Sequence, residues 1–340
     1  MISPEDIIKA HSRIKPYLHR TPIATSQTIN RLLGGNNFFF KLECKQKIGS
    51  FKARGAFNKI LSLKEQGKMP KKIVAVSSGN HAQGTSLACK LFGIEGTIFM
   101  NRSVSPLKIQ AAKSYGTEVV LVDSNQEADE KARLAEKNGA YFIHPFDDDQ
   151  IIEGQGTACY EALTDLKKDN ININSIFVPC GGGGLLSGTY LAAKLFSDNI
   201  ATYAGEPINC NDAAISLKKD DLHIFDTLPP TIADGIRTLS ISKRTFFYLK
   251  KTGGIIEVSE EEIIYWTQWL QHLLKITCEP SSAVAMAACY KWLGKQSKKQ
   301  NILIIISGGN IAAETYRKIW EKNYLDVIPN IAANNTKSLL

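Results

Sequence analysis

The feature that most constrains the fold is a repeated alternation of short β-branched runs with helical patterns. A run at 72–78 precedes a helical pattern that extends through Cys89, and a run at 117–123 precedes a charged one near 126–138. Parallel strands need such crossover helices, which cover both faces of the sheet. The sequence therefore predicts an α/β fold with open, mainly parallel sheet. Further strands are indicated at 96–100, 141–146, 175–180, 202–206 and 301–307, the last almost wholly apolar as in a strand buried on both faces.

The composition is that of an ordinary globular chain. Its 340 residues are 44% hydrophobic and 22% charged, which excludes disorder and coiled coil and allows one large domain or two moderate ones. The net charge of +8 comes mainly from dispersed lysine doublets, which favours a solvated surface over a nucleic-acid stripe. Seven cysteines, an odd number without a CxxC pair, indicate free thiols in a reducing compartment.

The sequence also bears on location. Glu5 and Asp6 stand where a secretory signal needs positive charge followed by an apolar run. The longest uncharged stretch, 170–193, is interrupted by Pro179 and a run of glycines, so it is typical of a strand, a turn and a helix and not of a membrane span. We therefore expect a cytoplasmic protein without membrane or nucleic-acid partners.

Three glycine-rich turns follow predicted strands, where ligands of open α/β sheets bind. They begin at Ser77, Gly181 and Ser307. The four successive glycines 181–184 free backbone N–H groups to turn inward at the start of a helix, which predicts a phosphate cradle. No lysine follows as in a Walker motif, and the third glycine of GxGxxG is missing, although Glu206 keeps a dinucleotide site as a weaker alternative. A smaller phosphorylated cofactor fits better.

The segment GSFKARGA at 49–56 supplies a candidate for covalent chemistry. Lys52 lies between the apolar Phe51 and the small Ala53, an environment that lowers the pKa of an amine and exposes it to a carbonyl partner. Most lysines are solvated surface groups, so residue types alone favour a surface lysine over a catalytic one. The motifs around this lysine decide the interpretation.

Four motifs in this order closely resemble the pyridoxal-phosphate enzymes of the threonine/serine dehydratase and serine racemase family. They are SFKARG at 50–55, SSGNH at 77–81, the glycine run 181–184 and SGGN at 307–310, and the resemblance extends from about residue 3 to residue 320. The family implies a fold type II arrangement with open, twisted, mainly parallel sheets. A large cofactor-binding domain would comprise 1–69 and 149–325, a small mobile domain 70–148 and a C-terminal tail 326–340. A homodimer is also expected.

The resemblance assigns roles residue by residue. Lys52 would bind the cofactor covalently and then act as general base at the substrate's α-carbon. Phe51 would pack on the cofactor ring, Asn80 would hydrogen-bond its phenolic oxygen, and Ser307 would face its pyridine nitrogen. The cofactor phosphate would be bound by Gly181, Gly182, Gly183 and Gly184, and the substrate carboxylate by Ser77, Ser78, Gly79, Asn80 and His81.

A hydroxyl opposite the pyridine nitrogen leaves the ring a weak electron sink, which favours rapid loss of a β-hydroxyl. The expected reaction is conversion of a 3-hydroxy amino acid, threonine or serine, to a 2-oxo acid and ammonium. Ser78 matches the serine that acts on the opposite face of the α-carbon in serine racemases, so racemisation is the alternative activity. Hydroxyaspartate ammonia-lyase is a second alternative, because such enzymes share nearly all these motifs.

The resemblance also implies a divalent-cation loop at 206–212. Its ligands would be Glu206, the backbone carbonyl of Cys210, and Asp212, with water completing an oxygen shell suited to Mg²⁺, Mn²⁺ or Ca²⁺. Two features differ from racemases: the stretch 124–129 has no arginine, and Phe146 stands where a polar residue is common. A noncatalytic binding protein with this fold is the alternative from another class, and a dinucleotide oxidoreductase is the other enzymatic one.

Overall fold

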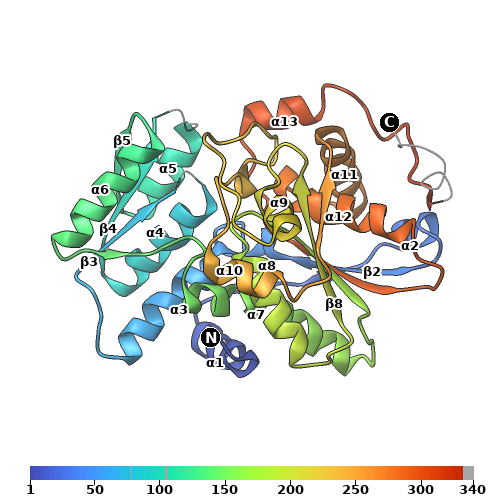
Figure 1. Cartoon of the computed structure of the whole chain (residues 1–340), viewed down its shortest axis with the longest axis horizontal. Helices are drawn as coiled ribbons and strands as arrows, with labels where there is room; N and C mark the ends of the chain where they lie inside the picture. The colour runs from blue at the N-terminus through green and yellow to red at the C-terminus, as the bar shows by residue number, and fades with distance from the viewer. Residues whose placement is uncertain (78, 103, 105, 332–340) are drawn as a thin grey trace.

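Two separate sheets organise the chain, as Figure 1 shows. The computed structural model describes residues 1–77, 79–102, 104 and 106–331. The larger sheet has six strands, and only its edge pair β1–β2 is antiparallel. In spatial order these strands are β1 (Ile23–Ala24), β2 (Asn37–Leu42), β10 (Asn301–Ile306), β7 (Ser175–Pro179), β8 (Ala201–Pro207) and β9 (Ile255–Val258).

The smaller sheet is entirely parallel and comes from one continuous part of the chain. It lies on the left in Figure 1, apart from the six-stranded sheet. The predicted α/β class with two mainly parallel sheets is therefore confirmed. The strands of the smaller sheet, in spatial order, are β5 (Glu118–Val122), β4 (Glu95–Asn101), β3 (Lys72–Val76) and β6 (Tyr141–Phe142).

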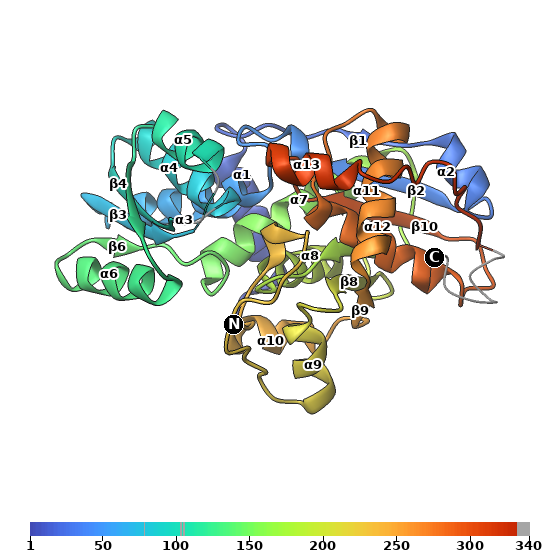
Figure 2. The same ribbon diagram turned by 90° about the horizontal axis from the view of Figure 1, so that it is seen from above.

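Helices begin where the sequence supplies caps. Asp148 accepts a hydrogen bond from Ile151 N at the start of α7, and Ser259 forms a capping box with Glu262 at the start of α11. The helices are α1 (Pro4–Ile14), α2 (Gln27–Leu32), α3 (Lys52–Glu65), α4 (Asn80–Phe92), α5 (Pro106–Ser114), α6 (Asn125–Lys137), α7 (Asp149–Lys168), α8 (Gly184–Lys194), α9 (Asp212–Lys219), α10 (Lys243–Leu249), α11 (Glu260–Leu274), α12 (Pro280–Leu293) and α13 (Ala313–Ile319), with short 3₁₀ turns η1 (Glu43–Lys45) and η2 (Asp234–Ile236). Viewed from above, α9 and α10 project from the larger part of the molecule (Figure 2).

The central strand β10 is buried on both faces. Ile302, Ile304 and Ile306 pack in one apolar cluster with α11 and α12. Leu303 and Ile305 pack in another with α7 and α8. Alternate side chains of a strand point to opposite faces of the sheet. The continuous apolar run 302–306 therefore fits a sheet that is covered by helices on both faces.

The strand predictions at 72–78, 96–100, 117–123, 175–180, 202–206 and 301–307 are confirmed within one or a few residues. The predicted strand 141–146 is shorter, because pairing with β3 ends after Phe142 and a loop begins. Strands β1, β2 and β9 were not predicted from the sequence. Sheet edges and a strand with a charged residue in it lack the apolar pattern on which the prediction depends.

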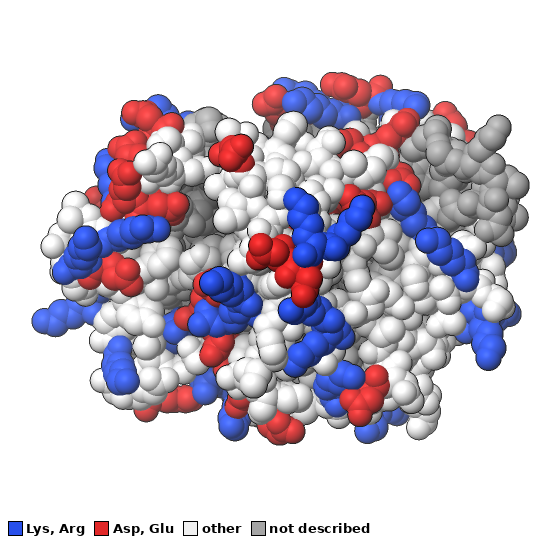
Figure 3. Space-filling model, in the orientation of Figure 1, with Lys and Arg blue, Asp and Glu red and all other residues white. Residues whose placement is uncertain are grey.

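Several surface expectations have direct structural counterparts. On the face drawn in Figure 3, basic and acidic side chains are interspersed, without a field of one sign. All seven cysteines are free thiols. Within the described residues, no helix combines the length and apolar character needed to cross a membrane. The first residues of the predicted tail are held in place, because Tyr265 and Tyr290 donate hydrogen bonds to the backbone oxygens of Val327 and Asn330.

Candidate active site

The predicted site residues come from the carboxyl ends of strands and the starts of helices. Lys52 is the first residue of α3, and Asn80 is the first residue of α4, after β3. The glycine run 181–184 joins β7 to α8, and Ser307 directly follows β10. Strand β3 belongs to the smaller sheet, and β7 and β10 belong to the larger one, so the site residues come from segments far apart in the sequence.

Lys52 has a desolvated amine with one fixed partner. Its Nζ donates a hydrogen bond to the backbone oxygen of Pro145 at 3.0 Å and lies 5.2 Å from the centre of the Phe51 ring. Desolvation lowers the pKa of this amine to about 8. At pH 7 about one such amine in ten is neutral, against fewer than about one in a thousand for an ordinary lysine. The structure therefore supplies a nucleophilic amine near neutrality, as the sequence predicts.

Asn80 is held by two residues from the larger sheet's side of the site. Its Nδ2 donates to Glu279 Oε1 and Oε2 at 3.1 and 3.3 Å, and its Oδ1 accepts from Asn310 Nδ2 at 2.7 Å. Asn310 also donates its backbone N–H to Glu279 Oε2 at 3.1 Å. The orientation of the Asn80 amide is therefore determined.

Glu279 is a carboxyl group buried without a cation in direct contact among the described residues. It is only 4% exposed, and it precedes Pro280, the first residue of α12. Burial raises the pKa of Glu279 to about 7, and the charge of Asp234 acts in the same direction, while hydrogen bonds from Asn80 and Asn310 oppose the rise. This group is therefore part-ionised at neutral pH.

Sequence reasoning assigned no role to Glu279, Asn310 or Ser282. Asn310 lies in the SGGN motif, but the motif alone does not indicate which residue it contacts. Glu279 precedes a proline, which is ordinary at the start of a helix. Glu279 and Asn80 are 199 residues apart, so their contact exists only in the folded chain. The one available signal was the position of Glu279 at a helix start that follows a run without acidic residues.

The four glycines form a cradle that side chains would fill. A Cβ at Gly182 would overlap the ring of Phe146, and one at Gly181 would lie 2.9 Å from the backbone oxygen of Ile236. Gly183 has φ +82°, a conformation that favours glycine. The first N–H groups of α8 have no acceptor within their own helix, and the helix dipole favours an anion there. The loop thus fits a phosphate group.

Ser307 is fixed as a neutral partner. It is 2% exposed, and its Oγ lies 2.9 Å from Ser282 Oγ on α12. Ser282 Oγ also accepts a hydrogen bond from Gly308 N at 2.8 Å. A hydroxyl supported by a second hydroxyl and by backbone carries no charge that could stabilise a protonated ring nitrogen. These observations fit pyridoxal phosphate with an unprotonated ring.

The substrate loop is described only in part. Ser78, the candidate second catalytic residue, lies outside the described residues. Ser77 Oγ accepts a hydrogen bond from Gly79 N at 3.2 Å. His81 Nε2 lies 3.0 Å from the backbone oxygen of Ile143, and desolvation, with the Lys52 charge, lowers the pKa of His81 to about 3. His81 is therefore a neutral hydrogen-bonding group and not a cation for the substrate carboxylate.

His144 and Phe146 lie beside the glycine run. Desolvation lowers the pKa of His144 to about 4, and its Nδ1 accepts hydrogen bonds from the backbone N–H groups of Phe146 and Asp147 at 3.3 and 2.8 Å. The two aromatic rings meet edge to face, with centres 4.6 Å apart. This contact fixes Phe146 against the glycine cradle.

The predicted cation loop brings two buried carboxyl groups together. Glu206 accepts hydrogen bonds from Ala213 N at 3.2 Å and Ala214 N at 2.8 Å. Asp212 Oδ1 accepts from Thr238 Oγ1 at 3.2 Å, and Asp212 Oδ2 is buried without a hydrogen-bond partner in the described structure. Burial raises the pKa of Asp212 to about 6 and, with the charge of Asp212, raises that of Glu206.

The same loop does not form a cluster of three metal-binding side chains. Among the described residues, no group of three or more His, Cys, Asp or Glu side chains could hold a metal ion. Cys210 is buried, with its Sγ 3.9 Å from the backbone oxygen of Thr238, and the predicted ligand was its backbone carbonyl. The two carboxyl groups are thus adjacent, and a cation site there stays a prediction.

Comparisons with known proteins agree with this geometry. The family described as "Pyridoxal-phosphate dependent enzyme" matches residues 14–308. Serine racemase of Dictyostelium discoideum is 39% identical over 323 residues, which cover 94% of this chain and 98% of that protein. L-threonine ammonia-lyase of Thermotoga maritima is 38% identical over 325 residues, 95% of this chain and 79% of the relative.

A solved structure shows the same fold. The crystal structure of T.th. threonine deaminase has 39% sequence identity and a TM-score of 0.86, and the match covers 92% of this chain and 99% of that one. The expected fold type II arrangement is therefore confirmed. The match to most of the chain, together with the lysine, the glycine cradle and the buried serine, places the chain in the family of pyridoxal-phosphate-dependent enzymes.

Proposed function

We propose that the chain is a threonine/serine ammonia-lyase that converts a 3-hydroxy amino acid to a 2-oxo acid and ammonium. The observation that carries this proposal is the uncharged Ser307–Ser282 pair at 2.9 Å, in the position that the resemblance assigns to the partner of the ring nitrogen. A carboxylate there would stabilise a long-lived carbanion, whereas a hydroxyl favours its rapid discharge by loss of a β-substituent.

The residues divide the work of binding and proton transfer. Bound pyridoxal phosphate would supply an electron-withdrawing ring conjugated with the substrate's α-carbon. The glycines Gly181 to Gly184 would hold its phosphate, Phe51 would pack on its ring and Asn80 would orient its phenolic oxygen. Residues 77–81 would bind the substrate carboxylate through hydrogen bonds, since the low pKa of His81 makes that side chain neutral.

Lys52 would hold and move the reacting proton. Its neutral amine would take the proton from the α-carbon, which requires the lowered pKa of about 8. The β-carbon–oxygen bond then breaks, and the hydroxyl takes a proton and leaves as water. Hydrolysis of the released enamine product gives the 2-oxo acid and ammonium. Lys52→Ala is expected to abolish turnover, and normal activity in that variant would refute the mechanism.

Racemisation is the second candidate activity, with hydroxyaspartate ammonia-lyase activity as a further alternative substrate choice. Racemisation is supported by the resemblance, which matches Ser78, the residue directly before Gly79 in the sequence, to the serine that acts on the second face in serine racemases. A residue on the opposite face of the α-carbon could return a proton there and invert the centre. Phe146, packed against the glycine cradle, favours the lyase, because racemases commonly place a polar residue at that position.

One time course distinguishes these activities. Cofactor-loaded protein is incubated with L-serine, and 2-oxo acid and both serine enantiomers are followed, with L-threonine and L-threo-3-hydroxyaspartate in parallel. The lyase predicts 2-oxo acid without D-serine. D-serine appearing faster than pyruvate would refute the lyase assignment in favour of the racemase. Ser78→Ala would then suppress racemisation far more than elimination if Ser78 acts on the second face, and both equally if it only shapes the loop.

We also propose a divalent-cation site formed by Glu206, the Cys210 carbonyl and Asp212. Two adjacent buried carboxyl groups, one with an unpartnered oxygen, form an environment that a hard cation would stabilise. The site is structural or activating, because it belongs to the loop after β8. Thermal shifts with Mg²⁺, Mn²⁺ and Ca²⁺ test it: the wild type should gain stability and Asp212→Ala should not. An equal thermal shift in the wild type and in Asp212→Ala would contradict the proposed ligands.

The remaining expectations are proposals of the same kind. A small domain of residues 70–148 would close on a large domain of 1–69 and 149–325 when substrate binds, excluding water from the site. Seven unpaired thiols support a reducing, cytoplasmic location. A homodimer is expected from the resemblance, and sedimentation of the purified protein measures it.

A further inference from the structure

A fully buried charged cluster lies behind the catalytic lysine. Arg54, two residues after Lys52, is 0% exposed. Its guanidinium makes two paired contacts with Glu43, Nε to Oε2 at 2.7 Å and Nη2 to Oε1 at 2.9 Å. It makes two more with Glu161, Nη1 to Oε1 at 2.9 Å and Nη2 to Oε2 at 2.8 Å. The two bidentate pairs fix both the position and the orientation of the guanidinium plane.

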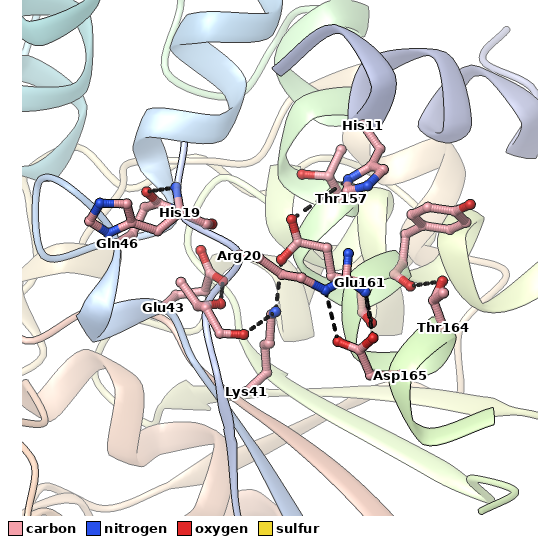
Figure 4. Close-up of polar contacts among 12 residues, drawn as sticks. His11, His19, Arg20, Lys41, Glu43, Gln46, Thr157, Glu161, Thr164 and Asp165 are labelled. Atoms are coloured by element: carbon pink, nitrogen blue, oxygen red, sulfur yellow. Dashed lines mark hydrogen bonds and ion pairs between the residues drawn. The ribbon is translucent and has the colours of Figure 1, made fainter. Parts of the chain in front are cut away.

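The cluster is balanced in charge and draws on several elements. Lys41 on β2 donates from Nζ to Glu161 Oε2 and to the backbone oxygen of Thr21, both at 2.8 Å. Two cations, Arg54 and Lys41, thus face two carboxylates. Figure 4 shows Lys41, Glu43 and Glu161, which come from β2, η1 and α7. Because charges and hydrogen bonds are matched, the cluster has one well-defined arrangement.

Two neighbouring helices pack closely against the backbone of Lys52 and Arg54. A Cβ at Gly154 of α7 would lie 2.5 Å from the backbone oxygen of Arg54. A Cβ at Gly84 of α4 would lie 3.1 Å from the backbone oxygen of Lys52. A side chain at position 154 would overlap this backbone and one at position 84 would crowd it, so α4 and α7 hold the first turn of α3 from two sides. Arg54 anchors that turn from a third direction.

We propose that Arg54 is a positioning residue that sets the direction in which Lys52 Nζ approaches the reacting carbon. This inference rests on the proposed role of Lys52. The effect is geometric and not electrostatic, because the cluster has no net charge and desolvation alone accounts for the lowered pKa of Lys52. A lysine at position 54 would keep the charge but could not make both bidentate contacts.

Arg54→Lys tests the proposal with three measurements. The kcat for 2-oxo acid formation should fall by about 10- to 100-fold, because a misplacement of about 1 Å at a reacting group costs about that much. The KM should change by less than about threefold, because Arg54 makes no hydrogen bond to the candidate substrate-binding residues that the structure describes. In cofactor-free protein, the rate of covalent pyridoxal phosphate uptake, followed by absorbance, should fall at least about tenfold.

The pH dependence of Lys52 acetylation in cofactor-free protein separates geometry from electrostatics. Positioning predicts an unchanged midpoint in Arg54→Lys, measured by peptide mass spectrometry. A shifted midpoint would overturn the geometric account. If wild-type protein forms no 2-oxo acid, the proposed function fails, while cofactor uptake still tests the positioning role independently.

Lys59→Met is the matched control on the same helix. Lys59 is 7% exposed, and its Nζ lies 2.6 Å from Oδ2 of the half-buried Asp148, so this variant also loses an ion pair of α3. It should lose stability while keeping kcat and cofactor uptake within about twofold. If Lys59→Met and Arg54→Lys lost kcat and cofactor uptake equally, Arg54 would have only a general stabilising role.

Thr157→Val keeps the proposal testable if Arg54→Lys does not fold. It removes the guanidinium contact from Nη1 to Thr157 Oγ1 at 3.2 Å, together with the hydrogen bond from Oγ1 to the backbone oxygen of Gly154 at 2.6 Å, and it preserves side-chain shape. It should lower kcat and cofactor uptake by about two- to fivefold in parallel, with KM unchanged. Unchanged uptake in this variant, in folded protein, would overturn the inference.

Discussion

Glu279→Gln should remove a pH-dependent loss of stability between pH 5 and pH 8. Glu279 is buried, and only neutral amide and backbone donors hydrogen-bond its carboxylate among the described residues. Burial raises its pKa from 4.5 to about 7. The folded protein therefore holds the Glu279 proton more tightly than the unfolded chain does. As pH rises from 4.5 through 7, the unfolded state gains from ionisation first, and the free energy of unfolding falls.

The size of this loss follows from the two pKa values. One pKa unit corresponds to about 1.4 kcal/mol, so the full loss above pH 7 is about 3 kcal/mol. Part of it has already occurred at pH 5, which leaves between about 2 and 3 kcal/mol for the range from pH 5 to pH 8. A glutamine does not titrate, so the difference in unfolding free energy between wild type and Glu279→Gln should change by that amount.

Urea unfolding of cofactor-free protein at half-unit steps of pH measures the difference. Asn80→Ala is the matched control, because it leaves Glu279 titratable but removes a hydrogen bond that lowers its pKa. That variant should extend the loss of stability to higher pH. Parallel curves for wild type and Glu279→Gln across this range would show that Glu279 does not titrate there, and the burial argument would then be wrong.

Two further predictions concern the glycine cradle and the buried cluster. Gly182→Ala places a methyl group in the ring of Phe146, so pyridoxal phosphate affinity should fall at least about tenfold by titration, and Gly182→Ala/Phe146→Ala should recover part of it; equal losses in both variants would contradict the steric account. Although burial opposes the change, Arg54 and Lys41 lower the pKa of Glu161 to about 2. The stability that ionised Glu161 contributes is therefore present above about pH 4.5 and lost as pH falls toward 2. Glu161→Gln should reduce this loss of stability in acid-unfolding experiments, and an unchanged slope of stability against pH would count against the pairing.

The sequence predicted those parts of the fold and site that depend on local pattern. The run 301–306 is apolar at every position after Asn301, so a strand buried on both faces was evident. The tetraglycine loop and Lys52 lie in short, distinctive motifs. By contrast, β2 contains Lys41, and a lysine in a sequence indicates solvent unless its partner is known. That partner, Glu161, is 120 residues away.

The same reasoning explains which site residues escaped prediction. Glu279 and Asn310 act through contacts with Asn80 that cross 199 and 230 residues of chain. Arg54 lies inside a recognised motif, yet its function depends on Glu43 and Glu161, which no local pattern connects to it. A buried charge has the same residue type as a solvated one, so only the fold reveals which carboxylates are compensated.

Compensation also determines which buried acids near the site can respond to pH. Glu161 faces two cations and stays ionised far below neutrality, so its cluster is a fixed support for the helix that carries Lys52. Among the described residues, only uncharged donors hydrogen-bond the Glu279 carboxyl group, and burial brings its pKa into the neutral range although the charge of Lys108 opposes the rise. Near neutral pH, the helix that carries Lys52 is therefore supported by a cluster whose charge stays constant, while Asn80 is hydrogen-bonded to a group that exchanges a proton near pH 7. Any pH dependence of cofactor binding that Glu279→Gln abolishes must then act through Asn80 and Asn310, and not through the support of the lysine.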